Sequence, residues 1–173
     1  SGNWNNCGNF VDASVSGTLT LKNTSIKTSR TYGISTAYSK YSGGTIDLQG
    51  NVTVNGTLST ENYAEDGASV NKGTLKVTSG NNFVKKFRVY GGYNSGATGT
   101  ISAGAGLKTD DLYAYNLFSN GQGWNIQCSM FVYGALKLTG EYSPTNGCTV
   151  IYNGGYFEAS SLKSYSSSVG TYE

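Results

Sequence analysis

Short runs in which apolar and polar residues alternate recur along the chain. The clearest is Gly44-Thr45-Ile46-Asp47-Leu48, and five further runs repeat its alternation. The leading apolar residues of the six runs lie 24 to 29 positions apart and are Leu19, Ile46, Leu75, Ile101, Ile126 and Val150. Self-similarity at a nearly fixed period in this range marks a repeat architecture. The pattern therefore predicts six structural repeats.

A second apolar run lies inside each repeat except the first. It begins 10 to 12 positions after the leading residue, at Leu58, Phe87, Leu112, Leu136 and Leu162. Glycine- and asparagine-rich segments such as Gly104-Ala105-Gly106 join the two runs, and these residue types accept the positive φ values of tight turns. Each repeat is thus expected to form strand, arc, strand. In the first repeat the second run, near Tyr32 to Tyr38, does not align.

The two periods together predict an all-β fold, a β-solenoid of about six stacked β-arches with parallel, in-register strands. Residues 17–173 are expected to form the solenoid, and residues 1–16 a loop and short strand that caps it. An antiparallel β-sandwich of short strands is the alternative, and no segment carries a helical period. The residues expected to align along the stack are Thr18, Leu19, Leu21, Thr45, Ile46, Leu48, Thr74, Leu75, Val77, Thr100, Ile101, Ile126, Thr149 and Val150.

Composition narrows the function more than the fold. The formal net charge is +2 and 13% of residues are charged, too little positive charge for nucleic-acid binding to be expected. No apolar run approaches the roughly 18 residues of a membrane helix, so membrane insertion is not expected. A tyrosine-rich chain of low charge is typical of extracellular surface proteins. A start at Ser1 without a leader is expected of a mature or trimmed chain.

Residues for catalysis are sparse. The chain has no histidine, so no neutral-pH imidazole base or Ser-His or Cys-His nucleophile exists. Two acidic pairs, Glu65-Asp66 and Asp110-Asp111, invite comparison with polysaccharide-degrading solenoids. Both pairs are expected in or beside links between repeats, with neighbouring side chains on opposite faces of a strand. No enzyme activity, metal site or cofactor is therefore predicted.

The three cysteines are Cys7, Cys128 and Cys148. The repeat pattern offsets Cys128 from Cys148 by about four residues, or ~13 Å, beyond disulfide reach. A bond from Cys7 to either, within or between chains, is the candidate disulfide, and the odd count leaves one thiol free or intermolecular. Three sequons make Asn23, Asn51 and Asn55 candidate glycosylation sites.

Tyrosines recur on or beside the second runs. They include Tyr90, Tyr93, Tyr113, Tyr115, Tyr133, Tyr152, Tyr156 and Tyr165. An exposed aromatic row stacks on sugar rings, which would make a carbohydrate-binding face. Rings that stack on each other, or between molecules, explain the same pattern.

The two ends of the predicted stack carry no strong capping signal. A parallel stack leaves an unpaired strand edge at each end, which is a template for further strands. The C-terminal segment Ser164–Glu173 offers neither a helix nor a cluster of charge. Low net charge and aligned like residues also favour cross-β stacking. Copies of the chain itself are therefore its expected partners.

Six strand-arc-strand layers, three cysteines, low charge and uncapped ends together resemble the sheath protein of methanogenic archaea. The resemblance covers residues 17–170 and is carried by the Thr-apolar-x-apolar runs and their second arms. It implies an extracellular, amyloid-like ring former whose β-arches stack into a tube around the cell. Autotransporter passengers and other adhesins carry similar repeats.

Three functions follow in order. The first is an extracellular structural protein that joins end to end into rings, tubes or fibres of a cell sheath or surface layer, with cysteines as candidate staples. The second is a surface adhesin or carbohydrate-binding module, which would take glycans as partners. The third is a small polysaccharide-active enzyme.

Overall fold

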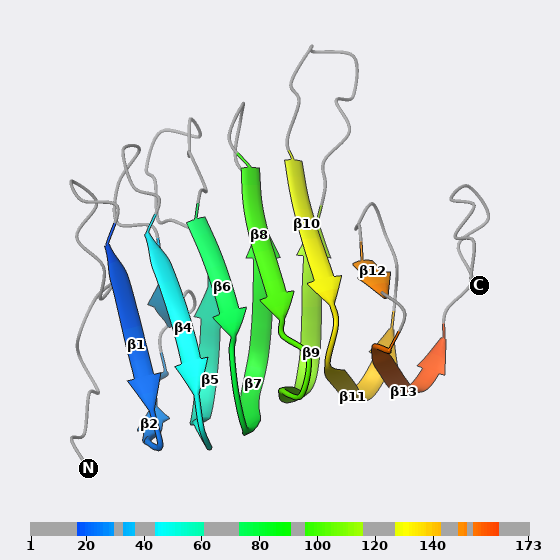
Figure 1. Cartoon of the computed structure of the whole chain (residues 1–173), viewed down its shortest axis with the longest axis horizontal. Helices are drawn as coiled ribbons and strands as arrows, with labels where there is room; N and C mark the ends of the chain where they lie inside the picture. The colour runs from blue at the N-terminus through cyan, green and yellow to red at the C-terminus, as the bar shows by residue number, and fades with distance from the viewer. Residues whose placement is uncertain are drawn as a thin grey trace.

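The computed structural model describes residues 17–29, 33–36, 44–60, 73–90, 96–115, 127–142, 149–151 and 154–162. All regular structure in these ranges is β-strand, and every strand pairing is parallel. Figure 1 shows the strands standing side by side in two facing rows. The predicted all-β class and parallel pairing are confirmed, and the antiparallel sandwich is wrong for these residues.

The first sheet contains the leading strand of each repeat. Its order is the order of the chain: β1 (Thr18–Lys22), β4 (Thr45–Gln49), β6 (Gly73–Val77), β8 (Gly96–Ile101), β10 (Gln127–Val132) and β12 (Thr149–Ile151). Threonine, isoleucine, leucine and valine supply most of the first three strands, as suits a pleated surface that is buried on one face.

The second sheet holds the second strands, again in chain order. They are β2 (Ser25–Lys27), β5 (Thr53–Ser59), β7 (Asn81–Tyr90), β9 (Gly106–Tyr115), β11 (Ala135–Tyr142) and β13 (Tyr156–Leu162). The two-residue β3 (Ile34–Ser35) also pairs with β5, so that Ile34 lies opposite Leu58. The first repeat therefore contributes two short strands where the others contribute one, which is why its second run does not align in the sequence.

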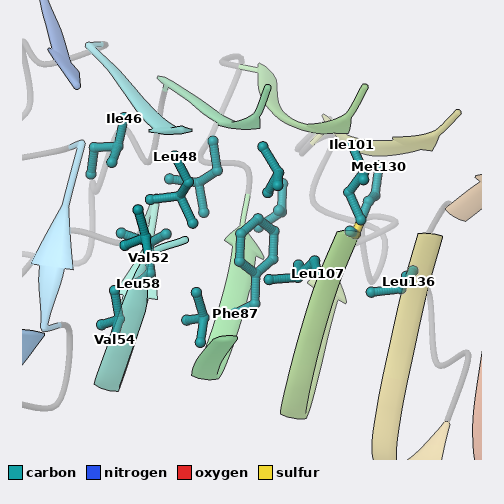
Figure 2. Packing of buried hydrophobic residues seen from close by; sticks show 14 of the residues in the cluster. Ile46, Leu48, Val52, Val54, Leu58, Phe87, Ile101, Leu107, Met130 and Leu136 are labelled. Atoms are coloured by element: carbon teal, nitrogen blue, oxygen red, sulfur yellow. The ribbon is translucent and has the colours of Figure 1, made fainter. Parts of the chain in front are cut away.

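A narrow apolar core fills the space between the sheets (Figure 2). Ile46, Leu48, Ile101 and Met130 reach it from the first sheet, and side chains such as Phe87 reach it from the second. All five are fully buried. Alternation along each strand puts these residues inward, and the stacking of like strands puts them beside one another.

Aligned threonines begin as predicted and then change register. Thr18, Thr45 and Thr74 are strand partners, but the next partner is Thr98 rather than Thr100. The same shift places Gly99 opposite Leu75 and Ile101 opposite Val77. The prediction that Ile101 would align with Leu75 is therefore wrong by two residues.

The register changes at Gly99, a glycine that faces the second sheet. A Cβ at Gly99 would lie 2.8 Å from Val89 Cγ2. The missing side chain of Gly99 thus makes room for Val89 within a densely packed core. Because glycine is not an apolar side chain, apolar alternation predicts that Ile101 rather than Gly99 lies opposite Leu75.

The later strands of the first sheet also differ from prediction. Met130 is the partner of Gly99, Val132 is the partner of Ile101, and Ile126 lies outside the described residues. Thr149 is opposite Met130 and Val150 is opposite Phe131, so their predicted positions are wrong. The register that results is an unbroken apolar column of Leu21, Leu48, Val77, Ile101, Val132 and Ile151.

Tight turns that connect the sheets use left-handed residues at equivalent places. Gly50, Gly80, Gly104 and Gly154 have φ between 75° and 88°, and Asn23 has φ of 46°. The predicted role of glycine and asparagine in the arcs is confirmed at these positions. Asn23 accepts a hydrogen bond from the Asn51 backbone at 3.0 Å, and Asn51 in turn accepts one from the Asn81 backbone at 3.2 Å.

A buried amide, that of Asn82, ties three neighbouring turns together. Its Oδ1 accepts a hydrogen bond from the Val52 backbone N–H at 3.1 Å. Its Nδ2 donates to the Gly106 carbonyl at 3.3 Å and to the Ser79 carbonyl at 3.0 Å. Asn82 occupies the position that Leu107 and Leu136 fill in the next two strands, yet it is 3% exposed. It satisfies backbone groups that the turn would otherwise bury unpaired.

Candidate functional site: two sheet edges and an outward bend

The edge at β1 exposes side chains that are buried elsewhere in the sheet. Leu19 and Leu21 are half-buried, whereas their partners Ile46 and Leu48 are 0% exposed. All four face the core, so the difference arises because β1 has a described neighbour on one side alone. The core therefore ends at β1 with part of its apolar surface uncovered.

Backbone groups of β1 alternate between β4 and the side on which no described strand lies. The Asn23 N–H donates to Gln49 O, and Gly17 O accepts from the Thr45 N–H, so odd-numbered residues bond to β4. Alternate residues of a parallel strand bond to opposite sides. The N–H and C=O of Thr18, Thr20 and Lys22 therefore point away from β4.

The opposite end of the second sheet, at β13, has the same character. Phe157 is the strand partner of the fully buried Leu136 but is itself half-buried. The Tyr156 N–H donates to Gly134 O, so alternation directs the N–H groups of Phe157 and Ala159 away from β11. In the described part of the chain, both ends of the two sheets thus present strand edges with a partly uncovered core.

Three side chains on β11 and β13 form an exposed polar cluster. Lys137 Nζ lies 2.6 Å from Glu158 Oε1, and the Tyr156 hydroxyl donates to Glu158 Oε2 at 2.9 Å. The hydrogen bond from Lys137, followed by that from Tyr156, lowers the pKa of Glu158. The bond to Glu158 raises the pKa of Lys137 and of Tyr156. This end of the sheet therefore carries a carboxylate that stays ionised well below neutral pH.

The outer face of the second sheet bends, and polar pairs occupy the bend. Lys85-Lys86 and Asp110-Asp111 are each exposed at both positions, and Lys86 is the partner of Asp111. Register shifts occur at equivalent places in neighbouring strands, between Val54 and Thr57 and between Leu138 and Glu141. A β-bulge of this kind lets two successive side chains point the same way.

Two expectations about the acidic pair Asp110-Asp111 are therefore wrong. The pair lies inside β9 rather than in or beside a link, and its side chains do not take opposite faces because the strand bends there. Asp110 Oδ1 accepts a hydrogen bond from Thr139 Oγ1 at 2.8 Å. Glu65-Asp66 lies outside the described residues. Within the described ranges, no three acidic or cysteine side chains gather closely enough to hold a metal ion.

The sequence reasoning missed Lys85-Lys86. The signal that would have found it is a pair of consecutive polar residues about midway along the second strand, which recurs as Asn55-Gly56, Lys85-Lys86 and Asp110-Asp111. Two adjacent polar residues interrupt the alternation of a strand. At the same place in successive repeats they mark a shared bend rather than a strand end.

The tyrosines whose side chains are described do not form one row. Tyr113 lies on β9 with its ring 4.8 Å from the Arg88 guanidinium carbon. Tyr133 and Tyr156, which are 40% and 56% exposed, lie instead at the turn that precedes β11 and the start of β13. Tyr90 and Tyr115 are strand partners by backbone register. Tyr93, Tyr152 and Tyr165 lie outside the described residues.

The cysteines remain largely outside the described structure. Cys7 and Cys148 lie beyond it, and Cys128 is placed by backbone register alone, opposite Ala97. Thr149, the residue after Cys148, lies opposite Met130, which is two residues after Cys128. The predicted offset between Cys128 and Cys148 involves a residue outside the described ranges and stays a prediction.

The three sequon asparagines are exposed and keep their status as candidates. Asn23 and Asn51 bond to the turn of the next repeat through Oδ1. Asn55 lies at the outward bend, where its carbonyl accepts a hydrogen bond from the Thr28 N–H.

The described ranges contain no helix long and apolar enough to cross a membrane. No protein-family model matches the chain, and no curated protein and no solved structure matches it either.

Proposed function

We propose that the chain is a β-solenoid that polymerises end to end as an extracellular structural protein, with no catalytic role. One layer is defined as a strand of the first sheet together with the strand or strands of the second sheet that follow it. The observation that supports the proposal most is the partial exposure of Leu19, Leu21 and Phe157, whose partners in neighbouring layers are fully buried. The stack ends as if a further layer belonged there.

The end of the stack at β12 and β13 can pair with the end at β1 and β2 of another copy, rather than with the same end of that copy. All described pairings are parallel, so the free edge of β12 can take the β1 of another copy in the sense that β10 takes β12. The free edge of β13 can likewise take β2 and β3. Such head-to-tail contacts are heterologous, and they build open filaments, or rings when the rotation between copies closes.

Register adds a second argument for the same contact. The partner columns run Ser25–Thr53–Phe83–Lys108–Lys137–Glu158 and Ile26–Val54–Val84–Thr109–Leu138–Ala159. Continued into a second copy, they place Ala159 beside Ile26 and Glu158 beside Ser25. Glu158 then lies diagonal to the exposed Lys27, within reach of a cross-strand ion pair. The contact would thus pair the apolar Ala159 with Ile26 and the acidic Glu158 with the basic Lys27.

Extracellular placement and a sheath or surface layer belong to the same proposal. The tyrosine-rich composition of low charge and the resemblance to methanogen sheath protein support them. Cysteines would serve as staples between copies. A surface adhesin is the other candidate, but the scattered positions of Tyr113, Tyr133 and Tyr156 weaken its aromatic face.

The test uses one proline at each end. Thr20→Pro and Ala159→Pro each remove an N–H that points to a free edge, where proline is tolerated. Electron microscopy of the unaltered chain should show rings, tubes or fibres with a strand spacing of about 4.8 Å. Each variant alone should stay monomeric, because every contact needs both ends, and a small fraction of either should shorten wild-type polymers by blocking one end.

A mixture of the two variants separates head-to-tail contact from other modes. Each variant retains one functional end, so equal amounts should form heterodimers that grow no further. Thr20→Val, which keeps the N–H, is the matched control and should polymerise. A chain that stays monomeric in dilute buffer, or a Thr20→Pro variant that assembles like wild type, would overturn the proposal.

A further inference from the structure

A basic groove lies on the outer face of the second sheet at its N-terminal end. It has a volume of about 490 Å³ and is bordered by β2, β5 and β7 together with the residues that follow β2. Among the described residues, four basic side chains line it and no carboxylate does: the four are Lys27, Lys85, Lys86 and Arg88. In a chain of net charge +2 this is a local concentration of positive charge.

The groove exists because side-chain volume is missing at the bend. The second strand of the first layer is interrupted between Lys27 and Ile34, whereas β5 and β7 continue past that point. On β5 the register shift between Val54 and Thr57 brings Gly56 to the floor of the groove. A Cβ at Gly56 would overlap the Thr28 side chain and carbonyl oxygen, so a larger residue does not fit.

The groove also carries neutral hydrogen-bonding groups and one preoriented cation. Thr28, Ser29 and Asn55 line it beside the lysines. Arg88 is half-buried, and its guanidinium lies over the Tyr113 ring at 4.8 Å, which limits its rotamers. A guanidinium held in this way loses less conformational entropy when it binds an anionic group.

The positive region is bounded. Asp111 is the strand partner of Lys86, and Asp110 is its neighbour on β9, so the sign of the charge reverses one strand beyond β7. An extended polyanion that ran across the sheet would meet these carboxylates. A short ligand confined to β2, β5 and β7 would not. The volume lies within the range of small-ligand sites, about 300–1,000 Å³.

We propose that this groove binds a short anionic saccharide, with carboxylate or sulfate groups held by Lys85, Lys86 and Arg88. Its hydroxyls bond to Thr28, Ser29 and Asn55. Charge-assisted hydrogen bonds from lysine and arginine suit both anions. Lys27 borders both the groove and the proposed contact between copies, whereas Lys85, Lys86 and Arg88 lie on β7, two strands further into the sheet.

The test compares saccharides that differ in charge. Calorimetry on the full chain would use galacturonate oligomers, sulfated dextran oligomers, neutral dextran oligomers, inorganic phosphate and single-stranded oligothymidylate, all at physiological salt. Binding of a carboxylated or sulfated oligomer, with none of the neutral one, is expected. The carboxylated and sulfated arms identify which anion the site prefers. Equal or tighter binding of oligothymidylate or of phosphate alone would overturn the saccharide assignment.

A matched pair of double variants tests the location. Lys85→Gln/Lys86→Gln should weaken binding about tenfold or more, the loss of one to two charge-assisted bonds. Lys22→Gln/Lys76→Gln removes the same charge from exposed positions on the first sheet and should leave affinity unchanged. Equal weakening by both doubles would show diffuse electrostatic attraction and overturn the groove. Circular dichroism of each variant verifies that the sheet is intact.

Discussion

Two regions of the second sheet differ in which residues they accept: the turns that precede its strands, called the turn side, and the bends midway along them, called the bend side. At the turn side, left-handed residues stack closely on one another, and backbone atoms decide what fits. At the bend side, Lys85-Lys86 and Asp110-Asp111 are exposed at both positions, whereas Asn55-Gly56 and Thr139-Gly140 each present one exposed side chain followed by a glycine. The turn side is thus restricted to a few residue types, whereas the bend side is free to carry charge and ligands. The turn side therefore contributes most to stability, and the bend side offers positions whose side chains can vary.

The largest expected effect on stability comes from alanine substitution of two glycines on the turn side. Gly80→Ala should destabilise the fold by more than about 4 kcal/mol, because its Cβ would overlap the Gly50 backbone. Gly104 has nearly the same φ, but nothing lies within 4 Å of a Cβ there. Gly104→Ala should therefore cost only about 1–2 kcal/mol of left-handed strain. Urea unfolding of both variants measures the difference, and equal losses would contradict a role for close stacking.

The next effect concerns the buried amide of the same side. Asn82→Ala should cost about 2–4 kcal/mol, because it leaves the Val52 N–H buried without its partner and removes the bond to the half-buried Gly106 carbonyl. Asn51→Ala removes one exposed bond, to the Asn81 N–H, and should cost about 0.5–1.5 kcal/mol. Thermal unfolding followed by circular dichroism ranks the two. If Asn82→Ala proves as mild as Asn51→Ala, the buried amide does not tie the turns together.

At the bend side the expected effect on stability is small. Thr139→Val removes the exposed hydrogen bond to Asp110 and should change the free energy of unfolding by less than about 1 kcal/mol. Asp110→Asn leaves an acceptor in place and should change it still less. Urea midpoints for both variants test the claim. A loss as large as that of Asn82→Ala would show that the bend is as restricted as the turns.

The smallest effect is the pH dependence of the Lys137–Glu158 pair. Glu158 has a folded pKa below its usual 4.5, so its stabilisation is present above that value and is lost as pH falls through the folded pKa. Lys137 has a pKa raised above 10.5, so its contribution persists up to that value and disappears at higher pH. The difference in urea midpoint between wild type and Glu158→Gln should therefore be present at pH 7 and absent near pH 2. A difference that does not depend on pH would contradict the ion pair.

The sequence predicted the turn side better than the bend side for a physical reason. Positive φ restricts a position to glycine or asparagine, so Gly50, Gly80 and Gly104 are visible in the chain itself. The bend needs no particular residue, because a bulge accepts many side chains that face solvent. Alternation therefore predicts Asp110-Asp111 in or beside a link and gives no signal at Lys85-Lys86. The basic groove depends on three strands at once and has no local pattern.

Register shows the limit of apolar alternation more clearly. Leu48 and Val77 were aligned correctly because apolar residues fill both inward positions. Gly99 interrupts the apolar pattern because it carries no side chain, and Val89 Cγ2 on the facing sheet lies nearest to where its Cβ would be. The size of a residue on the facing sheet cannot be inferred from the strand that packs against it. The predicted position of Val150 is wrong as well, and Ile126 lies outside the described residues.

Glycosylation of Asn55 would compete with ligand binding in the basic groove. Asn55 is both a sequon and a residue of the basic groove. A glycan attached there would occupy the space proposed for an anionic saccharide. Glycosylation of Asn55 and ligand binding are thus mutually exclusive, whereas glycans on Asn23 or Asn51 leave the groove open.

Within each sheet all strands run in one direction and follow one another in chain order, and this has a consequence for any assembly of the chain. A polymer built by head-to-tail addition of such units is polar, because its two tips expose different surfaces. One tip offers Leu19 and Lys27, and the other offers Phe157 and Glu158. Growth rates at the tips need not be equal, and a cell could nucleate, anchor or halt growth with a protein that recognises one tip alone.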